Sequence, residues 1–277
     1  MFLNKNIAFY FLCIIIEEEV FIYDKKRIKK EYKVKKKALK KKYKEDKEDL
    51  IKEYVVKINE EPKINMSKEA PYRGVLEEVG NAVSHGVGSI FAIVAFILML
   101  LKCDKTIEYI ASIIYFFGLF VLFTMSCLYH SFPYGSKVKK VFRRFDYSSI
   151  YLLIGATFAP LTLMYVGGTF GLVFCISQWV IIITGITMIC VFGPSRLKWL
   201  HFPLYLILGW SALIFLPQMI KNDLTMFLFI LGGGIIYTLG LIPFTIDKKV
   251  SHFLWHIFVL LGAIVQWLGI YLFMFCK

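Results

Sequence analysis

The sequence lacks the short motifs that mark disulfide-rich proteins and soluble nucleotide-binding enzymes. Its six cysteines show no Cys-x-x-Cys spacing, and most lie inside apolar runs, where they behave as small buried hydrophobic residues. It contains no P-loop and no GxGxxG pattern after a strand. The glycine triplet at 232–234 lies within an apolar stretch and is typical of a helix-packing surface. These absences leave no support for a soluble enzyme or a nucleotide site.

What the chain has instead is long apolar runs. Hydrophobic residues make up 58% of its 277 residues, and the mean hydropathy is +0.63, which is the composition of a polytopic membrane protein. Each apolar stretch after residue 80 has about 20 residues or more, enough to cross a bilayer as a helix. Because lipid offers no partners to free backbone groups, continuous helices are expected. We therefore predict an all-α, seven-transmembrane helix bundle with spans near 80–101, 107–132, 146–166, 169–192, 200–219, 224–246 and 250–275.

The chain before these spans has a different composition. Residues 1–23 contain an apolar run, Ile7 to Ile16, that is too short to span a bilayer of about 30 Å, so we predict an interfacial or targeting segment there. Residues 24–73 form a basic, low-complexity tail that supplies most of the net charge of +13. Its interleaved acidic residues favour a disordered, solvated tail over a nucleic-acid partner, although anionic lipid is a further partner that it can touch. Residues 74–277 are then the membrane domain.

Basic residues are divided unevenly between the loops, and this division predicts a cytoplasmic N-terminus. With the basic tail inside, the inner loops 133–145, 193–199 and 247–249 carry nine lysines and arginines. The outer loops carry only Lys102, Lys105 and Lys221. Lysine and arginine are enriched on the cytoplasmic side of membrane proteins. We therefore expect an integral, multi-pass protein with its N-terminus inside, in a membrane that the sequence does not identify.

This orientation brings three of the five histidines to one depth. His130 ends the second span, and His252 and His256 begin the seventh. His252 and His256 are four residues apart, so they share one helix face and can chelate one ion. Imidazole suits zinc, iron, copper or nickel, and three protein ligands with one open position are the set of a catalytic zinc site. We predict that His130, His252 and His256 bind one such metal ion.

Further polar residues at the same depth are candidates to complete the site. Ser126 lies one turn before His130, and Asp146 opens the third span; we predict that both are catalytic. Asp146 would hold a water as base or serve as a fourth ligand, and by itself it would equally suit an ion pair at a helix start. On the first span, a polar stripe at i, i+4 and i+8 is predicted to surround the ligands. The stripe consists of Glu77, Asn81 and His85.

Taken together, these motifs resemble the hemolysin III group of the progestin and adipoQ receptor (PAQR) family and, more distantly, the alkaline ceramidases. The matching stretches are Glu77-x3-Asn81-x3-His85-Gly86, Ser126-x3-His130, residues 146–157, residues 232–240 and His252-x3-His256. The resemblance implies a seven-helix protein with zinc near the cytoplasmic face. It also implies that the three histidines bind zinc, that Asp146 holds the zinc-bound water and that Ser126 lines the site. Tyr147 and Gln266 depart from the family, where histidine is common at both positions.

The expected function is a zinc-dependent intramembrane hydrolase acting on a lipid amide or ester. Zinc would activate a water, Asp146 would accept its proton, and Ser126 would donate a hydrogen bond to the developing oxyanion. Two alternatives stay open: a pore-forming, hemolysin-like membrane protein, and a lipid-responsive receptor whose zinc is structural. Membrane lipids are the expected partners and nucleic acid is not. The sequence specifies neither the substrate nor the oligomeric state.

Overall fold

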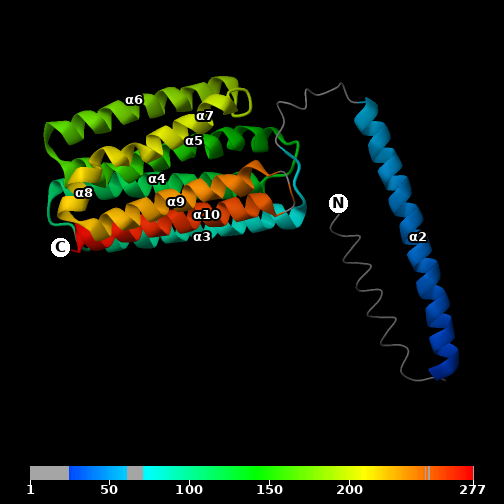
Figure 1. Cartoon of the computed structure of the whole chain (residues 1–277). Helices are drawn as coiled ribbons and strands as arrows, with labels where there is room; N and C mark the ends of the chain where they lie inside the picture. The colour runs from blue at the N-terminus through cyan, green and yellow to red at the C-terminus, as the bar shows by residue number, and fades with distance from the viewer. Residues whose placement is uncertain (1–24, 61–70, 247, 249, 277) are drawn as a thin grey trace. The chain divides into compact units, whose positions relative to one another are not determined.

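The computed structural model describes residues 25–60, 71–246, 248 and 250–276 (Figure 1). All regular secondary structure in these ranges is helical, which confirms the all-α prediction. The chain divides between Met66 and Ser67 into two units, which are described separately. The apolar run predicted to be an interfacial or targeting segment, within residues 1–23, lies outside the described residues.

The structure describes most of the lysine-rich segment as helix, where the sequence favoured a disordered, solvated tail. A single helix, α2 (Lys25–Glu60), occupies most of it. The physical reason is that the segment contains no glycine or proline and is rich in good helix formers such as lysine and glutamate. Opposite charges one turn apart add support: Lys41 lies 3.7 Å from Glu45, and Lys52 lies 3.4 Å from Asp49. Helix propensity thus accounts for the helical state of α2 despite its charge density.

Among its described residues, the second unit contains seven helical segments that are long and apolar enough to cross a membrane, as predicted. Three of them continue through a π- or 3₁₀-helical turn (η). The segments are α3 (Val75–Leu100), α4 (Thr106–Ser131), α5 (Lys137–Pro160) with η3 (Leu161–Val166), α6 (Gly168–Phe192), α7 (Lys198–Trp210) with η4 (Ser211–Phe215) and α8 (Leu216–Asn222), α9 (Leu224–Thr245), and α10 (Ser251–Ile270) with η5 (Tyr271–Phe275).

The third span begins nine residues before its predicted start at 146. Ser136 caps α5, and its hydroxyl oxygen accepts a hydrogen bond from the backbone N–H of Lys139 at 3.1 Å. The basic stretch at 137–144 therefore continues the helix beyond the apolar part instead of forming a loop. This extension places lysines and arginines of α5 beside the ends of neighbouring helices.

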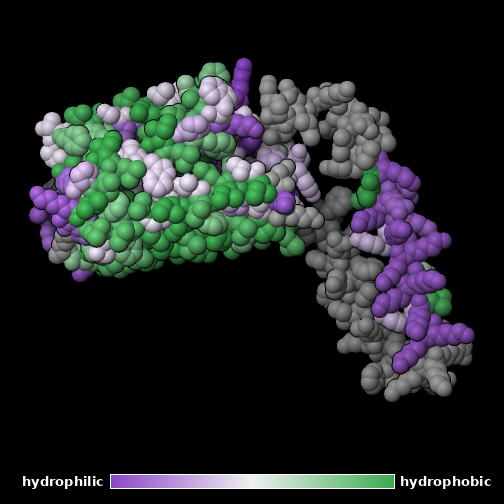
Figure 2. Space-filling model, viewed as in Figure 1, coloured by the Kyte–Doolittle hydropathy of each residue, from purple (hydrophilic) through white to green (hydrophobic). Residues whose placement is uncertain are grey.

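The seven helices run alongside one another in a bundle whose visible surface is mostly hydrophobic (Figures 1 and 2). The most extensive packing joins α9 to α10, α4 to α5 and α3 to α4, and α10 also packs on α3. A short connection at 101–105 joins α3 and α4 into an antiparallel pair. Consequently the start of α3, the end of α4 and the start of α10 meet at one end of the bundle.

Candidate metal centre

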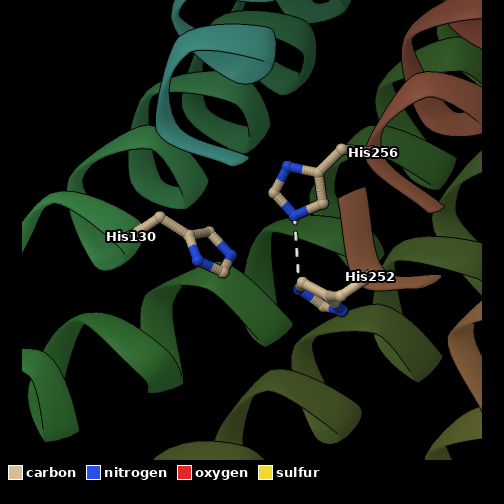
Figure 3. A group of neighbouring side chains, drawn as sticks. All are labelled: His130, His252 and His256. Carbon is tan, nitrogen blue, oxygen red and sulfur yellow. Dashed lines mark hydrogen bonds between the residues drawn. The ribbon is translucent and has the colours of Figure 1, made fainter. Parts of the chain in front are cut away.

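Three imidazoles converge at this end of the bundle (Figure 3). His130 lies in the last turn of α4, and His252 and His256 lie in the first turns of α10. One ring nitrogen from each lies within 4.8 Å of the other two. His130 and His256 are almost fully buried, and His252 borders a cavity. A cluster of this size and chemistry can hold one metal ion.

The second nitrogens of two of these rings are held by protein groups. Nδ1 of His130 lies 2.5 Å from the Glu78 carboxylate, and Nδ1 of His256 lies 3.1 Å from the carbonyl oxygen of Asn81. If each Nδ1–H donates to its oxygen, each Nε2 is unprotonated and has a lone pair available for a metal ion. Metal-binding histidines usually donate their other N–H in this way, which fixes tautomer and ring orientation.

The other ring nitrogen of His130, Nε2, is also arranged as expected for a metal-binding histidine. This atom is buried and has no hydrogen-bond partner among the described residues. An unsatisfied buried polar atom costs about 1–3 kcal/mol, so native structures seldom leave one without reason. A bound cation would satisfy Nε2 of His130 together with the Nε2 atoms of His252 and His256. The residues present therefore fit a metal ion, and its identity is treated below as a proposal.

A carboxylate next to the polar stripe on α3 contacts the histidine cluster. Glu77 lies 3.7 Å from Nε of Arg73, while Glu78 contacts His130. Glu78 was not among the predicted residues. Its spacing of three from Asn81 and seven from His85 puts it near the same helix face as these two, so the sequence could have offered it as a candidate beside Glu77 without choosing between them.

Asn81 and His85 both contact histidines of the cluster. The side-chain amide of Asn81 lies 3.4 Å from Nδ1 of His130. The ring of His85 stacks on that of His256, with centroids 3.7 Å apart and an angle of 17° between the planes. These contacts restrain the orientation of the two ligand rings, because neither ring can rotate without displacing its neighbour.

Ser126 and Asp146 lie together beside the cluster. The Ser126 side chain is buried, 2% exposed. Both residues line the same cavity as His252 and His256. Ser126 comes from α4, one turn before His130, and Asp146 comes from α5. The tertiary structure thus brings the two predicted catalytic residues to the histidine end of the cavity.

The cavity has a volume of about 160 Å³ and runs from this polar end into an apolar interior. Along α10 its lining extends from His252 to Gln266, a rise of about 21 Å at 1.5 Å per residue. Away from the histidines the lining is largely hydrophobic and includes Leu161, Leu213, Met219, Phe227, Ile230 and Leu241. The shape and polarity suit an extended apolar chain with a polar group near the histidines.

The chain is similar to several known proteins of one family. The profile of the family described as "Haemolysin-III related" matches residues 73–267. "Hemolysin-3" from Bacillus cereus is 34% identical over 195 residues, which are 68% of this chain and 88% of that protein. "Hemolysin-3 homolog" from Bacillus subtilis (strain 168) is 30% identical over 195 residues, 68% and 90% of the two chains.

A mammalian protein also matches. "Monocyte to macrophage differentiation factor" from Homo sapiens is 28% identical over 224 residues, which are 76% of this chain and 92% of that protein. Every residue of the histidine cluster and its surroundings described above falls within the matched range 73–267. The lysine-rich helix α2 precedes that range.

Proposed function

The chain belongs to the Haemolysin-III-related family of integral membrane proteins, and from this premise we propose that it is a zinc-dependent intramembrane hydrolase of a lipid amide or ester. The observation that carries the proposal is the meeting of the three histidines with Asp146 and Ser126 at one end of an apolar cavity. It supports the proposal because a cation site, a proton acceptor and a hydroxyl donor would then surround the polar part of a bound lipid.

His130, His252 and His256 would hold the zinc ion. Zinc bound in this way supplies Lewis-acid polarisation of a carbonyl and lowers the pKa of a water to about 7. The three neutral imidazoles leave this positive charge uncompensated. Glu78, which contacts His130, and Asp146, which lines the same cavity, would both contribute negative charge beside it.

Asp146 would act as the general base. Its carboxylate would orient the attacking water and accept a proton from it. Ser126 and Asp146 line the same cavity, and a hydrogen bond from the Ser126 hydroxyl would limit the directions in which Asp146 can point. When a substrate carbonyl is present, the same hydroxyl would donate to the developing oxyanion.

The cavity supports a lipid substrate. An acyl chain would lie along the hydrophobic walls of α5, α7, α9 and α10, and the scissile amide or ester would lie at the histidine end. Ligand pockets are typically apolar with a few convergent polar groups. We also propose the orientation predicted from the loop charges, with the N-terminus and the histidine end at the cytoplasmic face.

The test is turnover of a panel of lipid amides, including ceramides, and lipid esters by the purified, zinc-loaded protein. Asp146→Asn should retain stoichiometric zinc and lose about 10²- to 10⁴-fold in rate, the usual contribution of a general base. Asp223→Asn is the matched control, because Asp223 caps α9 through the N–H of Met226 and is not part of the cavity lining. Stoichiometric zinc without turnover of any lipid would contradict the proposal.

The printed name of the two bacterial relatives raises a lytic function as the alternative. A wide aqueous path needs a continuous polar lining, and the cavity described here is largely apolar. Leakage of liposomes that persists in His256→Ala would favour lysis. Lipid binding without turnover, retained in Asp146→Asn, would instead favour a receptor with structural zinc.

A further inference from the structure

A buried lysine outside the ligand set is connected to the histidine cluster by two routes. Lys139 of α5 is 1% exposed, although lysine is rarely buried unless it is paired. We infer that Lys139 is a positioning residue for His130, acting through the Glu78 carboxylate and through the last turn of α4. The inference rests on the metal site of the proposed function but not on hydrolysis.

All three N–H donors of the Lys139 ammonium group have acceptors on Glu78 or on the end of α4. Its Nζ donates to the carbonyl oxygens of Tyr129 and Phe132, at 3.1 and 2.9 Å, and it lies 3.1 Å from Oε1 of Glu78. An ammonium group has three N–H donors, so three acceptors saturate it. A saturated group has no donor left for a substrate, and Lys139 is not part of the cavity lining. Its role is therefore to hold other groups in place.

The first route runs through the side chain of Glu78. Oε1 of Glu78 contacts Nζ of Lys139, and Oε2 contacts Nδ1 of His130. Because each carboxylate oxygen has its own partner, the carboxylate cannot rotate toward His130 without losing Lys139, or toward Lys139 without losing His130. Lys139 thus sets the position from which Glu78 holds the imidazole and keeps Nε2 directed at the other two histidines.

The second route runs through the backbone of α4. Tyr129 and Phe132 flank His130 in sequence, and α4 ends at Ser131. The last four carbonyl groups of a helix have no intrahelical partner, and a cation near this end is favourable. Lys139 supplies both a donor and a charge there, and its Nζ also lies 4.7 Å from the centre of the Tyr129 ring. The turn that carries His130 is therefore fixed by the same ammonium group.

The test measures metal affinity of the full-length protein by competition with a zinc chelator, together with the visible spectrum of the Co²⁺-substituted protein. Lys139→Met and Glu78→Gln should each weaken zinc binding about 10- to 100-fold, the usual effect of losing an outer partner of a metal ligand. Both should also alter the Co²⁺ spectrum, which reports ligand geometry. Lys137→Met is the matched control, because Lys137 is an exposed lysine of the same helix, and should change neither measurement.

The double variant Lys139→Met/Glu78→Gln separates positioning from general stabilisation. If Lys139 acts through Glu78, the double variant should lose clearly less affinity than the sum of the two single losses, because residues of one network couple. A Lys139→Met protein that unfolds at lower temperature but keeps wild-type zinc affinity and Co²⁺ spectrum would overturn the inference. So would strictly additive losses. Neither measurement involves a lipid, so failure of the hydrolase proposal would leave this result interpretable.

Discussion

The Nε2 atoms of His252 and His256 lie 3.3 Å apart, one turn from each other on α10. Two nitrogen ligands about 2.05 Å from a tetrahedral zinc ion are themselves separated by about 3.3 Å. The two rings thus already have the spacing that zinc coordination requires. Little rearrangement of α10 is needed for metal binding, and the histidine pair can act as a preformed chelate.

This geometry predicts that metal content depends on the cluster and not on buried histidines in general. His256→Ala should lose most of the bound metal, because it leaves only two imidazoles. His201→Gln should retain it, because His201 is buried elsewhere and bonds to the hydroxyl of Tyr151 at 2.9 Å. The measurement is metal content per protein by elemental analysis. Equal metal loss in both variants would contradict a specific site.

Metal removal should also lower the stability of the protein. A ligand that binds only the folded state stabilises it, by about 2.7 kcal/mol at a concentration of 100 times Kd. A strong chelator should therefore lower the melting temperature of the wild-type protein in detergent, and added zinc should restore it. His256→Ala should show no response to either treatment. A chelator-sensitive melting temperature in that variant would argue against the three-histidine site.

Two glycines of the cavity wall provide a test of chain length. A Cβ atom added to Gly209 would meet no atom within 4 Å, and one added to Gly234 would meet only Trp210, at 4.0 Å. Gly209→Leu and Gly234→Leu should therefore fill part of the cavity without a clash and reduce binding of long-chain lipids more than of short-chain ones. The measurement is binding across a series of acyl-chain lengths.

The control for the cavity variants is a neighbouring glycine outside the lining. Gly232 does not line the cavity, and its added Cβ would lie 3.8 Å from Val265. Gly232→Leu should keep the wild-type preference for chain length. If all three variants kept that preference, the apolar cavity would not be where the chain binds.

A close contact between α4 and α5 predicts a stability effect. A Cβ added to Gly118 would lie 2.2 Å from Cβ of Ala156 and 2.9 Å from the carbonyl oxygen of Leu152, so the two helices would have to separate. Gly118→Ala should destabilise the bundle by about 1–3 kcal/mol, as overpacking usually does. Thermal unfolding in detergent measures this, with Gly232→Ala as the unhindered control. Equal melting temperatures would show that the helices tolerate the separation.

Helix α2 should bind anionic membranes in a salt-dependent way. Its lysines are concentrated in residues 25–44, and each basic residue near an anionic surface contributes about 1 kcal/mol. We expect protection of α2 from hydrogen exchange in nanodiscs that contain phosphatidylserine, and less protection in high salt or in neutral lipid. Replacement of Lys35, Lys36, Lys37, Lys40, Lys41 and Lys42 by glutamine should remove it. Protection that is independent of lipid charge would contradict an electrostatic contact.

Apolar length and helical period are local properties, and so the sequence predicted most of the fold. A hydrophobic run of about 20 residues spans a bilayer whatever surrounds it, and all seven predicted spans correspond to helices. The pair His252 and His256 is local in the same sense, because residues four apart always share a helix face. The disordered tail expected from charge density stays a prediction, and the structure describes residues 25–60 of it as the helix α2.

The amino-acid sequence by itself determined which residues can cross the membrane and which imidazoles can act together on one helix. The choice of Glu78 over Glu77 beside His130, and the burial of Lys139 between α3 and α4, were decided only by the tertiary structure. Neighbouring residues on a helix point about 100° apart, so the rotation of α3 against α4 and α5 selects one of two adjacent carboxylates. That rotation depends on packing between helices, which no local pattern in the chain encodes.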